Sequence, residues 1–239
     1  MKNPGIHIFQ TTEKLVDGFS ASFITEIESA KRSANPVHIA LSGGNTPKLF
    51  FQKLADKTHE VDWSFVHFYW GDERCVPPED EQSNYRMTQD FLLSKIDIPA
   101  RNIHRLRGEN DPVDEADRYA KELQTHLPEK SIDKPVFDWI ILGIGEDGHT
   151  ASIFPNMKPD YSNEVCLVAT HPQTGQKRVS LTMPVLNAAT RVSFLVSGNG
   201  KAHIVSDILN KRRPELPAAQ VIPENGVEWF LDAEAAALL

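Results

Sequence analysis

The chain has 239 residues and a mass of 26.8 kDa, a length that suits one large α/β domain or two small ones. Hydrophobic residues make up 40% and charged residues 24% of the chain, which excludes a disordered or collagen-like protein. The formal net charge is −8, so no overall basic field attracts nucleic acid or anionic lipid. An anionic ligand would therefore need a local cluster of cations or of backbone N–H groups.

Cysteine usage and the N-terminus bear on location. Cys75 and Cys166 are too few for a disulfide framework, which favours a reducing compartment. The opening segment MKNPGIHIFQTTEKL lacks the apolar stretch of about 7–15 residues that a secretory signal needs. No run approaches the ~20 apolar residues that cross a bilayer. We expect a cytoplasmic protein that has neither a membrane nor nucleic acid as a partner.

Short β-branched and aromatic runs alternate with helical patterns along the chain. Strands are predicted over residues 6–9, 37–41, 66–70, 137–142, 165–169, 192–196 and 227–230. Between the first two strands, apolar residues recur at every fourth position, which predicts a helix with one apolar face: Leu15, Phe19, Phe23 and Ile27. Further helices are predicted over 47–55, from Asn84 with Ser83 as N-cap, from Asp111-Pro112, over 201–209, and over the alanine-rich end with Asp232 as N-cap.

This alternation predicts a mostly parallel sheet covered by helices on both faces. Pro/Gly-rich stretches occur only as turns, so we expect a single α/β domain over residues 1–239. In such sheets ligands bind beyond the carboxyl ends of the strands. The loops that follow strands are therefore the places to look for chemistry.

The first such loop is LSGGNTP, residues 41–47, between a strand and a helix. Gly43 and Gly44 allow the backbone to approach a ligand closely, and Thr46-Pro47 starts the helix, whose free N–H groups and dipole attract anions. The loop is not a Walker motif, because the glycine spacing and the Gly-Lys pair are absent. The loop is therefore a candidate phosphate site, or a tight turn with ordinary capping.

The second loop follows the strand that ends at Trp70 and reads GDERCVPPEDEQSNY. Arg74 has the guanidinium that pairs with phosphate in bidentate geometry. Asp72 and Glu73 are possible metal ligands, but no His or Cys stands at useful spacing nearby, so no metal site is predicted. The acidic residues 79–81 are interpreted as a solvated turn.

The third loop is ILGIGEDGHTASIFPN, residues 141–156. Its glycines satisfy G-x-G-x-x-G, but Pro155 limits any following helix and Glu164 stands at the start of the next strand, so nicotinamide binding is rejected. His149 lies at a strand's carboxyl end, two residues after Asp147, and histidine is the usual general base near neutral pH. The alternative is a histidine satisfied within a turn.

Two basic residues outside these three loops also lie at the ends of predicted strands. Lys201 follows the turn SGNG, residues 197–200, just after a strand and at a helix start. Arg178 opens the strand-like run RVSLT. Each is a candidate anion ligand or a solvated surface charge.

Taken together, LSGGNTP, WGDER with SNY downstream, GIGEDGHTASIFP, RVSLTMPVLNAA, SGNGKA and EWFLDAEAA resemble the 6-phosphogluconolactonase family. The motifs run in family order from about residue 39 to the C-terminus. The resemblance implies a modified Rossmann-like α/β fold without a bound nucleotide. It also implies hydrolysis of 6-phospho-D-glucono-1,5-lactone to 6-phosphogluconate, in the oxidative pentose phosphate pathway, with no metal and no cofactor.

By the same resemblance, His149 activates water against the lactone carbonyl, and Asp147 either orients His149 or stabilises its loop. The resemblance also implies which residues bind the phosphate and the rest of the substrate: Ser42, Gly43, Gly44, Asn45, Thr46, Arg74, Arg178 and Lys201. No serine or cysteine stands in a G-x-S-x-G elbow, so no covalent nucleophile is predicted. The expected partner is a small phosphosugar lactone, and the expected assembly is a monomer or weak homodimer.

Two other functions remain open from the sequence alone. One is an amino-sugar phosphate deaminase or aldose–ketose isomerase of the same fold. Glucosamine-6-phosphate deaminases carry a D-G-H loop, but that loop continues toward N-E-P and their second strand ends in an M-D-E-Y-type segment. Here the corresponding segments are Phe154-Pro155-Asn156 and GDER, residues 71–74. A sugar-phosphate sensor is the other possibility, although it would tolerate loss of the base, and His149 is present.

Overall fold

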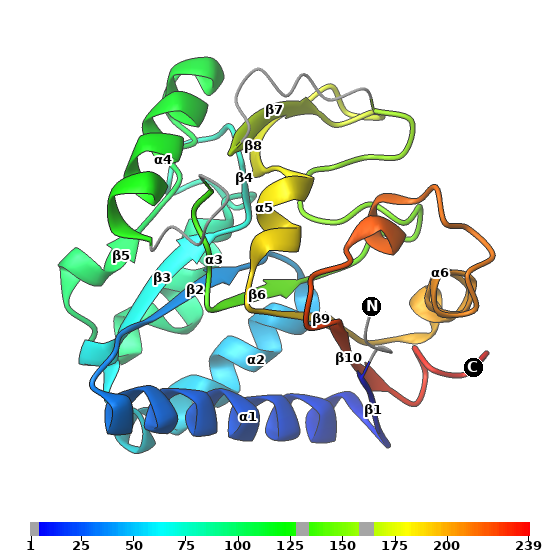
Figure 1. The fold of residues 1–239 in the computed structure, drawn as a ribbon, viewed down its shortest axis with the longest axis horizontal. Helices are drawn as coiled ribbons and strands as arrows, with labels where there is room; N and C mark the ends of the chain where they lie inside the picture. The colour runs from blue at the N-terminus through cyan, green and yellow to red at the C-terminus, as the bar shows by residue number, and fades with distance from the viewer. Residues whose placement is uncertain (1–4, 128–133, 158–164) are drawn as a thin grey trace.

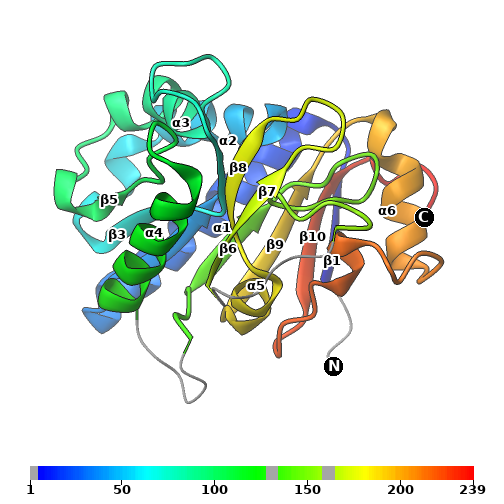
Figure 2. The same cartoon turned by 90° about the horizontal axis from the view of Figure 1, so that it is seen from above.

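The computed structural model describes residues 5–127, 134–157 and 165–239. Seven strands form a sheet in which every neighbouring pair is parallel. In spatial order these strands are β1 (Gly5–Phe9), β10 (Val227–Asp232), β9 (Arg191–Val196), β6 (Trp139–Leu142), β2 (Val37–Leu41), β3 (Val66–Trp70) and β5 (Ile103–His104). Figure 2 shows β3, β6, β9, β10 and β1 from left to right, the reverse of this order, and β2, which is not labelled there, lies between β3 and β6.

Helices cover both faces of the sheet, as the sequence predicts. The α-helices are α1 (Thr12–Ser33), α2 (Asn45–Asp56), α3 (Asn84–Phe91), α4 (Pro112–His126), α5 (Met183–Ala188) and α6 (Ala202–Leu209). In Figure 1, α1 and α2 lie below the sheet, whereas α4 and α5 lie above it. Short 3-10 helices are also present: Thr58–Glu60, Trp63–Phe65, Leu93–Lys95, Ala100–Asn102, Asn199–Lys201 and Pro217–Gln220. Of the helices that the structure describes, none is long and apolar enough to cross a bilayer.

Helix α1 forms because its first residue is capped and one of its faces is apolar. Thr11 caps it by accepting a hydrogen bond from the Lys14 N–H, and its apolar stripe is fully buried against the sheet. The Phe19 ring packs edge-on against Phe50 of α2, with ring centroids 4.9 Å apart. This aromatic packing fixes α2, and with it the N-terminus that faces the site described below.

A second, smaller sheet lies over the first and was not predicted. Its strands are β4 (Asp72–Arg74), β8 (Lys177–Leu181) and β7 (Cys166–Thr170), and both pairings are antiparallel. The predicted strand over 165–169 exists, but it belongs to this sheet. The register places Arg74 directly opposite Arg178, although 103 residues separate them in the chain.

The predicted C-terminal helix is wrong. Residues 233–238 form successive turns after β10. The carboxylate of Asp232 does accept a hydrogen bond from the Ala235 N–H at 2.8 Å, as an N-cap would, but it also binds Thr12 and Gly198. A segment of this length is marginal as a helix without tertiary support.

Candidate active site

A cavity of about 460 Å³ opens at the carboxyl edge of the parallel sheet. Loops that follow β2, β3, β6 and β9 surround it, which is the position that the topology favours for a ligand. Its lining residues are Ser42, Gly43, Gly44, Asn45, Thr46, Pro47, Asp72, Arg74, Asn84, Gly143, Ile144, Gly145, His149, Ala151, Arg178, Leu195, Val196, Ser197 and Lys201.

The N-terminus of α2 forms part of the cavity wall. Its N-cap is Gly44, at φ 112°, so this helix has no side-chain cap, and the N–H groups of its first turn have no side-chain acceptor. Free N–H groups at a helix N-terminus, together with the helix dipole, attract anions, so this wall of the cavity is a candidate anion site. Gly43 is required for packing, because a Cβ built there would lie 1.9 Å from Asn84 Oδ1.

The acidic residues after β3 are structural. Glu73 is 2% exposed, and its carboxylate accepts hydrogen bonds from the N–H groups of Arg74, Asn84 and Tyr85. Burial raises the pKa of Glu73, against the lowering effect of these N–H donors. The Asp72 carboxylate accepts a 2.5 Å hydrogen bond from Ser152 Oγ. In the described part of the chain, no group of three or more metal-ligating side chains gathers here or elsewhere.

Two arginines face the cavity from the small sheet. The Nε–H groups of Arg74 and Arg178 are buried and have no hydrogen-bond partner among the described residues. Burial, together with the neighbouring charge of Arg74, lowers the pKa of Arg178. The nearest carboxylate oxygen to Arg178, on Asp72, is 4.0 Å away. Two adjacent cations with buried, unpaired donors favour an anionic ligand.

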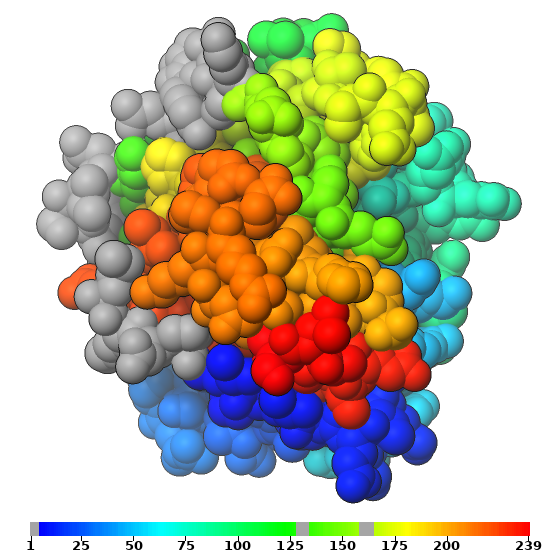
Figure 3. Space-filling view, turned by 90° about the vertical axis from the view of Figure 1, so that its right-hand side faces the viewer, coloured from blue at the N-terminus to red at the C-terminus, as the bar shows by residue number. Residues whose placement is uncertain are grey.

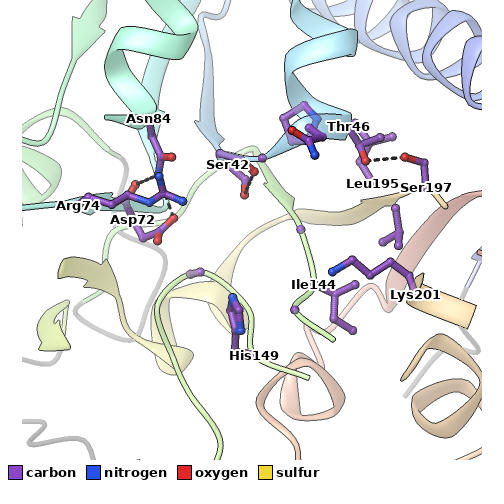
Figure 4. A pocket seen from close by; sticks show the side chains of 18 of the residues that line it. Ser42, Thr46, Asp72, Arg74, Asn84, Ile144, His149, Leu195, Ser197 and Lys201 are labelled. Atoms are coloured by element: carbon purple, nitrogen blue, oxygen red, sulfur yellow. Dashed lines mark hydrogen bonds between the residues drawn. The ribbon is translucent and has the colours of Figure 1, made fainter. Parts of the chain in front are cut away.

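Lys201 approaches from the opposite side (Figure 4). It ends the 3-10 helix Asn199–Lys201 after β9, its side chain extends toward the middle of the cavity, and it forms no ion pair within the described residues. Beside it, Ser197 Oγ and Thr46 Oγ1 share a hydrogen bond of 2.8 Å. This bond joins the loop after β9 to the N-terminus of α2.

His149 lies below these groups in Figure 4, on the loop after β6. Its Nδ1 is 2.6 Å from Asp147 Oδ1, and its backbone N–H donates to the same oxygen. Burial raises the pKa of Asp147, but the donors on His149 outweigh it and hold that pKa below its usual range. Because an ionised carboxylate only accepts hydrogen bonds, Nδ1 carries the hydrogen in the neutral imidazole, and that tautomer leaves a lone pair on Nε2.

The glycines of this loop make room for the histidine and shape its turn. A Cβ at Gly145 would lie 2.1 Å from His149 Nδ1 and 2.4 Å from Asp147 Oδ1. Gly148 has a φ of 85°, which only glycine adopts without strain. The Gly145 N–H donates to the His149 carbonyl at 2.9 Å and closes the turn. The loop therefore holds the imidazole against Asp147.

The structure brings most of the sequence-predicted site residues to one cavity. His149 and all eight predicted binding residues line it, whereas Asp147 lies behind His149 and lines a neighbouring hollow. Asn84 and Ser197 also line the cavity and were not predicted, although both lie within the SNY and SGNGKA motifs. Nothing in their spacing distinguishes them from ordinary capping and turn residues.

The parallel sheet, with an open helix N-terminus and an imidazole beyond the strand ends, defines a Rossmann-like α/β protein with a candidate site at the carboxyl edge of its sheet. Residues 10–230 match the family described as glucosamine-6-phosphate isomerases/6-phosphogluconolactonase. The chain belongs to this family.

Similar proteins include curated and structurally known members. A 6-phosphogluconolactonase of Haemophilus influenzae is 43% identical over 97% of this chain and 98% of its own length. The structure of 6-phosphogluconolactonase from Trypanosoma brucei covers 100% of both chains with a TM-score of 0.88 and 30% identity. A monomeric glucosamine-6-phosphate deaminase shares the fold, with a TM-score of 0.82 at 19% identity over 98% of this chain and 100% of its own.

Proposed function

We propose that this chain hydrolyses 6-phospho-D-glucono-1,5-lactone to 6-phosphogluconate. The observation that carries the proposal is the placement of one oriented imidazole and a set of unpaired anion-binding groups around a single cavity. Arg74 and Lys201 line the same cavity as the N-terminus of α2. The names of the relatives, 6-phosphogluconolactonase, agree with this chemistry.

In the proposed mechanism, Nε2 of His149 takes a proton from water, and the resulting hydroxide attacks the lactone C1 carbonyl. When the tetrahedral intermediate collapses, the C1–O5 bond breaks and the imidazolium returns the proton to the ring oxygen. The new carboxylic acid then ionises. Asp147 keeps the proton of His149 on Nδ1 and stabilises the imidazolium. A δ-lactone is an activated ester, so this route needs neither a covalent nucleophile nor a metal.

In this proposal the 6-phosphate binds at the N-terminus of α2, against Ser42, Gly43, Gly44, Asn45 and Thr46. Arg74 approaches it from one side and Lys201 from the other, as their places in Figure 4 allow. Arg178, opposite Arg74 in the small sheet, is assigned to substrate binding through its buried, unpaired Nε–H. Holding the phosphate fixes the distance between C1 and His149, which is how remote binding energy accelerates the reaction.

A coupled assay tests this function. Glucose-6-phosphate dehydrogenase generates the lactone, and we expect its disappearance to accelerate in proportion to added protein, with EDTA present or absent. Incubation with glucosamine 6-phosphate should release no ammonia. Ammonia release without lactone loss would assign the chain to the deaminase branch of the family instead.

The remaining parts of the proposal concern location and assembly. Within the described residues, neither Cys75 nor Cys166 forms a disulfide, which suits the reducing cytoplasm. The net charge of −8 disfavours a nucleic-acid partner. We propose a cytoplasmic monomer or weak homodimer.

A further inference from the structure

Asp232 lies at the end of β10, where the first and last segments of the chain meet. Figure 3 shows the C-terminal residues in red against the N-terminal residues in blue on this face. The side chain is 1% exposed, and the residue does not line the active-site cavity. Its Oδ2 accepts a 2.6 Å hydrogen bond from Thr12 Oγ1, and its Oδ1 accepts one of 2.8 Å from the Ala235 N–H.

The third donor to this carboxylate belongs to the active-site loop. The Gly198 N–H points between the two oxygens, at 3.0 Å from Oδ1 and 3.1 Å from Oδ2. Gly198 has a φ of 91°, and nothing lies within 4 Å of a Cβ built there, so no neighbouring atom packs against this side of the residue. The loop is therefore anchored on this side by its hydrogen bond to Asp232.

Ligand-binding groups lie on both sides of Gly198 in the chain. Ser197 precedes it and is bonded to Thr46 at the N-terminus of α2, and Lys201 follows three residues later with its Nζ in the cavity. The Lys201 N–H donates to the Gly198 carbonyl at 3.0 Å, so the position of one sets the position of the other. A shift of the Gly198 peptide would move the Lys201 cation relative to the helix N-terminus.

We propose that Asp232 is a positioning residue for phosphate binding: its buried carboxylate fixes the Gly198 peptide and thereby sets Lys201 against the α2 N-terminus. This inference rests on the proposed function, which assigns phosphate binding to those groups. A carboxylate suits the task because it accepts all three donors at once. An asparagine cannot, since Gly198 N–H contacts both oxygens and either orientation of an amide turns an N–H₂ group toward it.

The test compares wild type with Asp232→Asn, Asp232→Ala and Thr12→Val. Thr12→Val is the matched control, because it removes a donor to the same carboxylate on the side away from the loop. The readouts are KM and kcat for the phosphorylated lactone, kcat/KM for glucono-1,5-lactone, and the dissociation constant of inorganic phosphate by calorimetry. Each variant is assayed well below its measured Tm.

We expect both Asp232 variants to raise KM and the phosphate dissociation constant about tenfold, the scale of one lost hydrogen bond to a charged group. The kcat for the phosphorylated lactone and the turnover of glucono-1,5-lactone should change less than about threefold, because His149 and its loop are untouched. Thr12→Val should lower Tm and leave both constants unchanged.

The inference is overturned if folded Asp232→Asn or Asp232→Ala binds phosphate as wild type does, or if Thr12→Val weakens phosphate binding equally. A measurement on wild type adds a check that needs no variant: the Gly198 amide should exchange its hydrogen slowly, and exchange at the rate of an open loop overturns the proposal. Failure of the proposed function has a different signature. In that case wild type binds phosphate but does not hydrolyse the phosphorylated lactone.

Discussion

Asp147 and His149 are separated by one residue, and this short spacing lets a single turn hold both. The turn is possible because Gly145 has no Cβ and Gly148 adopts a positive φ. The Asp147 carboxylate, whose pKa lies below its usual range, stays ionised near neutral pH and so keeps a hydrogen-bond acceptor at Nδ1. In the proposed mechanism the free Nε2 is then the atom that meets the water.

The first prediction at this scale concerns the base. His149→Asn should lower kcat for the phosphorylated lactone by about 10²–10⁴-fold, the range typical of general-base loss. Binding of 6-phosphogluconate, measured by calorimetry, should change little because the phosphate groups remain. His59→Asn, at an exposed position outside the site, is the control and should retain wild-type activity. Near-normal turnover by folded His149→Asn would contradict the assignment.

The second prediction separates the two ends of the substrate. Arg74→Ala and Lys201→Ala should each lower kcat/KM for the phosphorylated lactone by about tenfold or more, since in the proposed function each removes a charged hydrogen bond to phosphate. Turnover of unphosphorylated glucono-1,5-lactone, which we expect to be slow because the substrate lacks the phosphate, should scarcely change. Lys121→Ala, on the exposed face of α4, controls for the loss of one surface charge. If a variant loses both activities in equal proportion, its residue does not bind phosphate.

At the scale of elements, the small antiparallel sheet places the segment after β3 at the edge of the candidate site. Strand β4 connects the main sheet to α3, and the Glu73 carboxylate joins the two by accepting from Ser83 Oγ and from the N–H groups of Asn84 and Tyr85. A buried carboxylate thus occupies the N-terminus of α3, where the helix dipole favours it. This contact sets Asn84 against Gly43 at the edge of the cavity.

Glu73→Gln should therefore lower the free energy of unfolding by about 2 kcal/mol. A glutamine amide retains one acceptor oxygen and turns an N–H₂ group toward donors that it cannot bind. Urea denaturation measures the effect, with Glu79→Gln as the control because Glu79 is exposed in the same segment. An unchanged midpoint for Glu73→Gln would show that the carboxylate does not hold α3.

At the scale of the whole molecule, a group of histidines joins β2, β3, β5 and α4, away from the residues that line the active-site cavity. His67 Nδ1 is 3.1 Å from His104 Nε2, and His104 Nδ1 is 3.0 Å from the Glu122 carboxylate. Burial, followed by the charges of His104 and His126, lowers the pKa of His38 to about 4. Burial and the neighbouring histidines likewise lower the pKa of His67 to about 4.

These shifts predict how stability depends on pH. Histidines in an unfolded chain have a pKa of about 6.5. Between pH 6.5 and about pH 4, the unfolded chain therefore binds more protons at His38 and His67 than the folded chain does. The free energy of unfolding should therefore fall as pH drops through this window, by at most about 1.4 kcal/mol per pH unit for each histidine.

Denaturant unfolding between pH 7 and 5 measures this slope without titrating most carboxylates. His38→Gln should reduce the slope, whereas His59→Gln, at an exposed position, should leave it unchanged. Equal slopes for wild type and His38→Gln would refute the assigned pKa direction.

The sequence by itself determined the main helices and strands, because these elements depend on the chemistry of neighbouring residues. Four-residue spacing predicted α1, alternating runs predicted the strands, and Ser83 and Asp111 act as the helix caps that their positions indicated. The glycine-rich loops could also be recognised from the sequence, since only glycine permits the backbone conformation at Gly44 and the turn that holds His149. Parallel topology then implied that these loops meet at one edge of the sheet.

Tertiary structure alone decided the contacts between segments distant in the chain. The pairing of Arg74 with Arg178 arises from strand register, and no spacing in the sequence encodes it. The sequence showed that Glu73 is acidic, but only the fold buries its carboxylate at the N-terminus of α3, where it accepts hydrogen bonds. Asp232 has the local signature of an N-cap, yet the residues that donate to it include Thr12 and Gly198. The terminal helix failed to form because a short alanine-rich segment has little stability of its own, so its conformation followed the contacts available to it.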